Sequence, residues 1–346
     1  MIAKWELKKI MFQNKAIIVI LAVLIFQFLL NFVNQPLRQH NYSEEIYKEY
    51  MNKMQGPYTE KKHIEIEKRD KEIKACIDLS ESKDEQYKKG EISIDEYAEY
   101  KNEYIRALAE AETVTYILEK CEYYKMHGGN FSFFYDTKWM DYIENEGYNY
   151  LSLIFVLCFV IPIFDQEFSS NARSMLLTTR NGRNKTYLSK MIFVSLFVFG
   201  ITYLLDMIRY FFFLKKYGYE YVNYGIKNLL NYAEFGNATL GQFCMYHYLL
   251  KAGIWMVEAG LLVLIVLVCK NIVFSFFTGI IVLVLPSYSQ KLLPVQWIKY
   301  MIPSVNLKNI YSMKLDMHWL LLALVIQYII FGVLGLLLWK RRSFLH

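Results

Sequence analysis

Four ionisable residues lie inside long apolar runs of the sequence: Asp206, Arg209, Lys251 and Glu258. A charge in a hydrocarbon environment is costly, so such residues usually mark interior or functional positions of a membrane protein. Asp206 and Arg209 are three residues apart and can pair on one face of a helix. Lys251 and Asp206 share a similar depth if their two runs form antiparallel helices, which predicts a Lys251–Asp206 salt bridge.

Glu258 lies two helical turns from Lys251 on the same face and has no evident partner in the sequence. Three roles remain open for it: a protonated carboxyl group, a hydrogen bond to a hydroxyl group of a neighbouring helix, or part of a substrate or ion path. The histidines show no metal-ligand spacing, and His247 beside two tyrosines fits an interfacial aromatic belt. No nucleophile–base pattern is present, so we expect no catalytic residue, metal or cofactor in this chain.

The apolar residues that surround these charges are clustered rather than spread. The chain has 346 residues, 55% of them hydrophobic, and a membrane span needs about 17 to 25 predominantly apolar residues. An uncleaved first helix is expected, because the first run is too long for a typical secretory signal and no small-x-small cleavage pattern follows it. The sequence therefore predicts an all-α membrane protein with six transmembrane helices. These are Ala16–Val33, Tyr148–Phe164, Lys190–Leu214, Leu249–Cys269, Ile272–Ser289 and Trp319–Trp339.

The positive charges give these spans an orientation. Lys and Arg accumulate in cytoplasmic loops, and here they are frequent before the first span, between the second and third spans, and after the sixth. The connections 215–248 and 290–318 carry fewer of them. We therefore expect a multi-pass protein of the plasma membrane with both termini in the cytoplasm and with residues 34–147 outside the cell.

Residues 34–147 form a separate region by composition. They hold 17 Lys or Arg against 25 Asp or Glu, a net charge of −8, whereas the rest of the chain holds 22 against 8. Two long amphipathic runs, 61–89 and 93–126, predict an α-helical hairpin, and 43–54 predicts a shorter helix. This extracellular domain is either a solvated lid or a negative field that attracts a cationic ligand, such as a positively charged peptide.

The ends of the second long helix carry recognisable signals. Ser93 followed by Glu96 is a capping-box pattern, and Gly128 is a natural stop. In a hairpin centred near residue 91, Cys76 and Cys121 would lie about 20 Å apart along the helices. A disulfide requires Cα atoms within about 7 Å, so we expect free thiols.

A patterned polar stretch joins the second and third spans. Asp165 and Glu167 would occupy the first turn of a short helix and Arg180 its last turn, as the helix dipole favours, and Asn181-Gly182 would end it. This spacing predicts an amphipathic helix over 165–182 that lies under the membrane and docks into a groove of a partner. Its apolar stripe consists of Phe164, Phe168, Ala172 and Leu176.

The stretch E-F-S-S-N-A-R-S-M-L-L-T-T-R-N-G-R-N-K resembles the intracellular loop of type-2 ABC (ABC-2) transporter permeases. W-E-L-K-K-I-M-F-Q-N-K at 5–15 is similar to the amphipathic N-terminal helix of that family. Y-M-I-P-S-V-N-L-K-N-I-Y, within 290–318, is similar to its proline-containing outer re-entrant segment. The resemblance covers the whole chain except 34–147, which is longer than the corresponding loop of the family.

The resemblance implies that 165–182 is a coupling helix seated in a separate cytosolic ABC ATPase. This chain has no G-x-x-x-x-G-K-[ST] phosphate loop, so ATP and magnesium would bind to that partner, present in two copies. A second permease copy or a related permease would complete the complex. The basic residues of the loop have an alternative role as phospholipid anchors. The implied coupling residues are Asp165, Glu167, Phe168, Ser169, Ser170, Arg173, Leu176, Arg180 and Arg183.

The expected organisation has three parts: 1–33 with the amphipathic helix and first span, 34–147 as the extracellular domain, and 148–346 with the other five spans. The expected function is that of the permease subunit of a bacterial ABC exporter. The substrate stays open among cationic peptides, lipids, drugs and ions, and no nucleic acid is expected as a partner. The alternative is a membrane sensor whose extracellular domain binds a ligand and signals to a cytosolic partner. An intramembrane enzyme is disfavoured, because the spans hold no paired catalytic residues.

Overall fold

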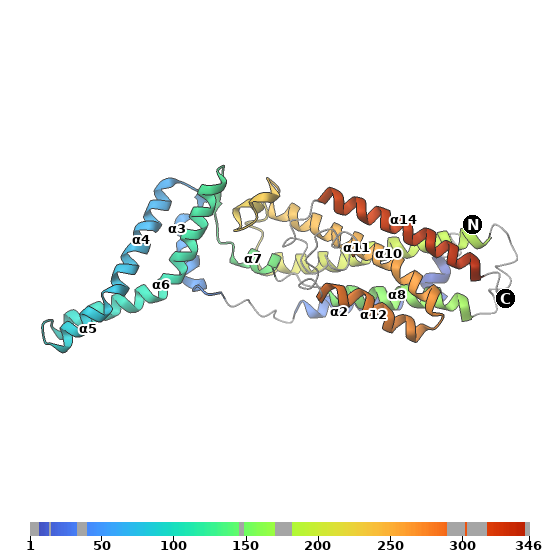
Figure 1. The fold of residues 1–346 in the computed structure, drawn as a ribbon, viewed down its shortest axis with the longest axis horizontal. Coiled ribbons are helices and arrows are strands. Elements are labelled where there is room, and N and C mark those ends of the chain that lie inside the picture. The colour runs from blue at the N-terminus through green and yellow to red at the C-terminus, as the bar shows by residue number, and fades with distance from the viewer. Residues whose placement is uncertain are drawn as a thin grey trace. The chain divides into compact units, whose positions relative to one another are not determined.

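The chain forms two compact helical units. The computed structural model describes residues 7–13, 15–32, 40–144, 149–169, 182–288, 302 and 317–342, and its elements are labelled in Figure 1. We call the first the apolar unit; it comprises residues 1–35, 144–217 and 244–346. We call the second the charged unit; it comprises residues 36–143 and 218–243.

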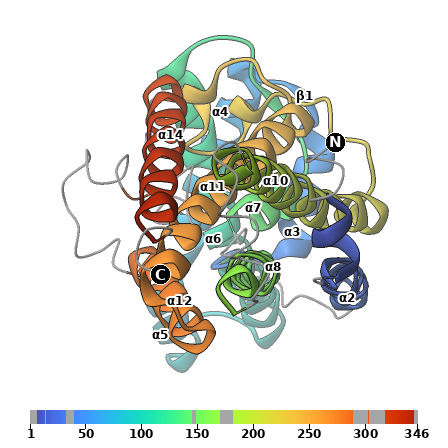
Figure 2. The same ribbon diagram turned by 90° about the vertical axis from the view of Figure 1, so that its right-hand side faces the viewer.

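The helices of the apolar unit coincide with the apolar runs of the sequence. Figure 2 looks along this unit, with α10 and α11 near its centre and α2, α12 and α14 at its periphery. Most of α11 is buried within this single chain, whereas α14 exposes most of its side chains. The helices are α2 (Ala16–Leu30), α8 (Tyr150–Ser169), α10 (Gly182–Tyr217), α11 (Leu240–Cys269), α12 (Ile272–Tyr288) and α14 (Met317–Arg342), preceded by the short π-helix η1 (Lys9–Gln13).

Three helical stretches of the described residues are long and apolar enough to cross a membrane: Asn184–Tyr217, Leu240–Cys269 and His318–Lys340. Three further apolar helices are shorter. For example, α2 has 15 residues and a length of about 22 Å, less than the hydrocarbon core of about 30 Å. The chain is therefore a mostly helical protein with the features of a membrane protein.

Two helices begin earlier than their apolar runs predict. α11 starts at Leu240 because Thr239 and Gln242 form a capping box, in which Gln242 N donates to Thr239 Oγ1 at 3.2 Å and Thr239 N to Gln242 Oε1 at 3.1 Å. α10 starts at Gly182, so Lys190 lies well inside that helix and is fully buried.

The charged unit is built around two long helices that lie side by side, α4 and α6 (Figure 1). The antiparallel strands pair Gly56 with Phe133 and Pro57 with Ser132. Its elements are α3 (Glu44–Met54), β1 (Gly56–Pro57), α4 (Glu60–Asp78), α5 (Ser80–Lys88), α6 (Ile94–His127), β2 (Ser132–Phe133), α7 (Thr137–Glu144) and the 3-10 turns η2 (Ile226–Asn228) and η3 (Ala233–Phe235).

The predicted helical hairpin is present, with its expected caps. Ser93 Oγ accepts a hydrogen bond from Glu96 N at 3.2 Å at the start of α6, and the helix ends before Gly128, whose φ is +58°. The run 61–89 is not one helix as predicted, because it divides at Leu79 into α4 and α5. α5 packs against α6, and the hydroxyl of Tyr97 on α6 donates a hydrogen bond to Asp84 on α5.

A second segment of the chain, 218–243, belongs to the charged unit, although the sequence predicts only a connection between two spans there. The Tyr124 hydroxyl donates to the carbonyl of Asn228 at 2.5 Å, and the amide of Ser132 donates to Asn228 Oδ1 at 2.9 Å. The amide of Ala233 donates to the Tyr123 hydroxyl at 2.6 Å. The charged unit is therefore assembled from two segments that are separated in the sequence by α8 and α10.

Candidate functional site

The predicted coupling helix lies mostly outside the described residues. α8 continues without a break to Ser169, so Asp165 and Glu167 lie in the last turns of α8 and not in the first turn of a separate helix. That boundary was predicted wrongly because no glycine, asparagine or other stop residue follows Phe164 before Asn171. Asp165 itself is half-buried.

Most of the other predicted coupling residues lie outside the described part of the chain, wholly or in their side chains. Ser170, Arg173, Leu176 and Arg180 lie outside the described residues, as does most of the expected re-entrant segment at 290–318. Of the expected N-terminal helix, residues 9–13 are described as η1. Helical backbone is described for four further coupling residues whose side chains lie outside the described part: Glu167, Phe168, Ser169 and Arg183.

The four ionisable residues of the apolar runs, in contrast, all lie within the described part of the chain. Asp206 on α10 and Lys251 and Glu258 on α11 are each no more than 2% exposed, while Arg209 is half-buried. Burying a charged group in an apolar helix bundle is unfavourable unless its partners compensate it. As predicted from the sequence, these three side chains face the interior of the apolar unit and not a surface that could contact lipid.

Asn149 connects the start of α8 to Asp206. Its side-chain oxygen accepts hydrogen bonds from the amides of Leu151 at 3.1 Å and Ser152 at 3.3 Å, which caps the helix. Its side-chain amide donates to Asp206 Oδ1 at 2.9 Å. Asn149 thus accepts from two backbone amides in the first turn of α8, which have no partner within the helix, and also donates to a buried carboxylate on α10. The predicted Lys251–Asp206 and Asp206–Arg209 pairs stay predictions.

Lys251 and Glu258 lie on the same face of α11, seven positions apart in the sequence. Both side chains are enclosed by the bundle. A buried amine and a buried carboxyl group along one helix can hold or transfer protons or bind an ion, and they can equally fix the packing of the helices. The choice among the three roles listed above for Glu258 stays open.

The charged unit contains a buried ion pair that was not predicted from the sequence. Lys120 on α6 lies 2.5 Å from Asp136, and Tyr47 on α3 donates a hydrogen bond to the same carboxylate at 2.6 Å. The Lys120 ammonium group also lies 5.9 Å from the ring centre of Tyr124 and 5.7 Å from that of Phe134. All these side chains are buried, so the cluster stabilises the fold and offers no access to a substrate.

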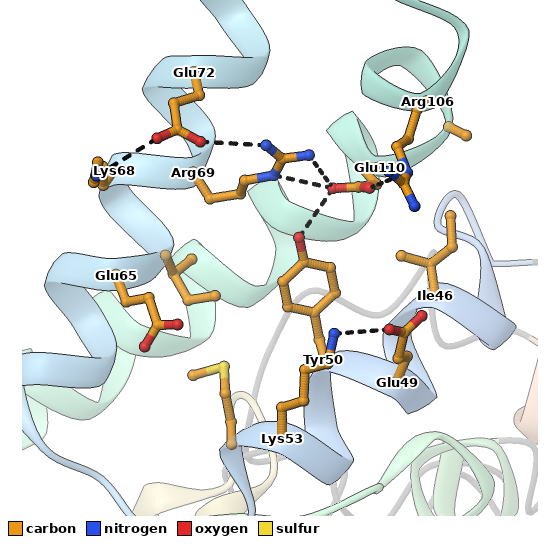
Figure 3. A pocket seen from close by; sticks show the side chains of 13 residues that line it. Ile46, Glu49, Tyr50, Lys53, Glu65, Lys68, Arg69, Glu72, Arg106 and Glu110 are labelled. Atoms are coloured by element: carbon orange, nitrogen blue, oxygen red, sulfur yellow. Dashed lines mark hydrogen bonds and ion pairs between the residues drawn. The ribbon is translucent and has the colours of Figure 1, made fainter. Parts of the chain in front are cut away.

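A surface pocket of about 580 Å³ lies between α3, α4 and α6 in the charged unit. Figure 3 shows that Glu110 is the centre of its polar network. Glu110 Oε2 accepts hydrogen bonds from Arg69 Nε at 3.1 Å, from Arg69 Nη2 at 2.9 Å and from the Tyr50 hydroxyl at 3.0 Å. Arg69 also binds Glu72 at 3.2 Å. This network fixes the polar wall of the pocket and joins all three helices.

The described residues thus hold two places where a ligand or ion could act: the buried polar face of the apolar unit and the pocket of the charged unit. Within these residues, no group of three or more His, Cys, Asp or Glu side chains is arranged to hold a metal ion. The five cysteines carry free thiols. In comparisons with known proteins, no family model, no curated protein and no solved structure matches this chain.

Proposed function

We propose that this chain is the membrane-spanning permease subunit of an ATP-driven bacterial ABC exporter. The six apolar helices would all cross the membrane, with both termini in the cytoplasm and the charged unit outside the cell. A separate cytosolic ATPase, in two copies, would bind the stretch 165–182 and supply the energy. The observation that carries the proposal is the coupling-loop pattern between α8 and α10, in an apolar unit that buries Asp206, Lys251 and Glu258.

The composition of the charged unit supports the proposed topology. Its two segments, 36–143 and 218–243, lie on either side of α8 and α10 in the sequence. Two segments of one compact unit must be on the same side of a membrane. If α8 and α10 each cross the membrane once, the chain crosses twice between the two segments and returns to the same side.

The coupling proposal is tested by expressing the chain with a candidate ABC ATPase from the same genome and measuring co-purification and transport. Glu167→Lys or Phe168→Ala should weaken both at least tenfold and leave membrane insertion unchanged, because a partner groove that accepts this stretch would lose a charge or an apolar contact. Glu220→Lys is the matched control, since it makes the same charge reversal at an exposed residue of the charged unit. Unchanged co-purification and transport in the Glu167 and Phe168 variants would overturn the proposal.

The orientation is tested independently with a cysteine placed at Ser170 in a chain whose native cysteines are replaced. A membrane-impermeant thiol reagent should modify it only after the membrane is opened. A cysteine at Glu220 should react in intact cells. Modification of the Ser170 cysteine from the outside would invert the proposed topology.

The second candidate function, a membrane sensor, is favoured by the pocket in the charged unit, which a transporter does not require. A sensor would signal to a cytosolic partner that hydrolyses no ATP for transport. Reconstitution in vesicles separates the two functions. ATP-dependent movement of a substrate supports the exporter, whereas ligand binding without any movement of substrate supports the sensor.

A further inference from the structure

The pocket between α3, α4 and α6 differs in charge from the region around it. The segment 34–147 carries a net charge of −8, but the pocket lining is balanced, with four acidic and four basic side chains. Each of the basic side chains has a carboxylate partner: Lys53 with Glu49, Lys68 and Arg69 with Glu72, and Arg106 with Glu110. A balanced pocket does not select a ligand of many positive charges.

Two charged groups on opposite walls of the pocket can still form hydrogen bonds or ion pairs with a ligand. Glu65 on α4 is exposed, and among the described residues its carboxylate has no hydrogen-bond or ion-pair partner. Arg106 on α6 is 79% exposed and reaches Glu110 Oε1 only at 3.7 Å, beyond the range of a hydrogen bond. A guanidinium group has five donors, so Arg106 can bind a further anion. Figure 3 shows both side chains at the pocket.

The floor between these two groups is apolar. Ile66 on α4 and Met54 on α3 are 3% and 6% exposed and line the pocket with Ile46 and the ring of Tyr50. The Tyr50 ring is held in place because its hydroxyl donates to Glu110. The pocket therefore presents a free carboxylate, an apolar floor and an available guanidinium group.

We propose that this pocket binds a short apolar peptide with free ends, which places its ammonium group at Glu65 and its carboxylate at Arg106. Apolar side chains of the peptide cover Ile66 and Met54. The volume lies within the range of about 300 to 1,000 Å³ that is usual for small-ligand pockets. This inference goes beyond the exporter proposal and does not depend on it, because binding to the charged unit needs neither transport nor an ATPase.

The test uses the full chain in detergent micelles and leucine peptides of two to four residues, since each extended residue adds about 3.3–3.6 Å of reach. Each peptide is titrated by calorimetry with free ends, with an acetylated N-terminus and with an amidated C-terminus. At each length the free-ended form should bind more tightly than the capped forms, and one length should bind more tightly than the others. Each cap should weaken binding by a factor of up to about five, the upper end for one solvent-exposed ion pair.

Two variants assign the ends of the peptide. Glu65→Gln should remove the effect of acetylation and keep that of amidation, whereas Arg106→Gln should do the reverse. Glu67→Gln and Lys125→Gln are matched controls, because they make the same changes of charge on α4 and α6 at residues that do not line the pocket. Both controls should retain both effects. The substituted side chains at 65 and 106 are exposed, so thermal unfolding should be unchanged in all four variants.

Three outcomes would overturn the inference. The first is that free-ended peptides show no binding, or bind no better than their capped forms. The second is that the control variants lose binding as much as the pocket variants do, which would indicate a general electrostatic effect. The third is that a doubly capped, lysine-rich peptide binds more tightly than the free-ended ones, which would indicate a site for cationic peptides. If the ATPase does not bind the stretch 165–182, only the exporter proposal fails, because peptide binding to the charged unit is measured without the ATPase.

Discussion

Lys120 Nζ on α6 lies 2.5 Å from Asp136 Oδ2 in the connection before α7, and neither side chain is more than 1% exposed. Tyr47 on α3 completes the arrangement, because its hydroxyl donates to the other oxygen of Asp136. Three segments of the charged unit therefore meet at one pair of opposite charges. Such a pair is costly to break, since the remaining charge would stay buried without compensation.

Asp136→Asn or Lys120→Met should each lower the free energy of unfolding of the charged unit by about 3–5 kcal/mol. Cys121, the next residue after Lys120, is fully buried and reports the opening of this region. We expect its modification by a thiol reagent, followed by peptide mass spectrometry, to accelerate strongly in both variants. The double variant should recover part of the protection, and Lys125→Met, at an exposed position of α6, should have little effect. Unchanged protection of Cys121 in the single variants would contradict a stabilising role.

The charged unit should lose stability in alkaline solution. Burial raises the pKa of the Cys121 thiol from 9.0 to about 12, an effect that Glu122 reinforces and Lys120 opposes. Above pH 9 the unfolded chain therefore releases a proton that the folded chain retains. Stability falls between pH 9 and about pH 12, by about 1.4 kcal/mol per pH unit from this group.

Thermal unfolding followed by circular dichroism measures this decline, with Cys121→Ala as the control. Burial also raises the pKa values of Tyr47 and Tyr124, so those residues contribute in the same direction above pH 10, their ordinary range. The control should differ from the natural chain in a shallower decline from pH 9 to about pH 12, because the tyrosine contributions are the same in both proteins. An identical decline in both proteins would contradict the assignment to Cys121.

Asn149 should be a stability residue of the apolar unit with two separable functions. Asn149→Ala removes the cap of α8, an effect of about 0.5–2 kcal/mol, and leaves Asp206 without this donor, an effect of about 1.5–3 kcal/mol. Asn149→Asp keeps an acceptor for the cap but replaces the donor to Asp206 with a second carboxylate. Thermal unfolding in detergent should therefore rank the natural chain above both variants, with Asn149→Asp improved by the additional change Asp206→Asn. No improvement in that double variant would contradict the contact.

Gly335 on α14 should tolerate a larger side chain poorly, because a Cβ atom there would overlap the hydroxyl oxygen of Tyr187 on α10. Gly335→Ala should lower the unfolding temperature by several degrees, since a rearrangement of a packed side chain costs about 1–3 kcal/mol. Gly332→Ala is the matched control on the same helix, as nothing lies within 4 Å of a Cβ atom at that position. The additional change Tyr187→Phe should partly restore Gly335→Ala. Equal effects of the two glycine substitutions would contradict this close packing.

Local patterns in the sequence predicted where most of the helices lie, but not all of their ends. The amphipathic runs of the charged unit predicted α4 and α6 as a hairpin, and Ser93 predicted where α6 begins, because hydrophobic periodicity and capping depend on residues only a few positions apart. The apolar runs likewise predicted the apolar parts of the other helices and the buried positions of Asp206, Lys251 and Glu258, but not the early starts of α10 and α11. The early start of α11 was also readable in principle, since Thr239 and Gln242 form a capping box.

The sequence by itself determined that the chain has an apolar helical part, with a few ionisable residues inside its apolar runs, and a separate charged helical part. Only the tertiary structure decided that 218–243 joins that charged part, that Lys120 meets Asp136, and that Glu65 and Arg106 border one pocket on α4 and α6. Each of these relationships depends on packing between distant segments. Local propensity and periodicity carry no information about which distant side chains meet, because burial and the pairing of charges are decided only when the helices pack together.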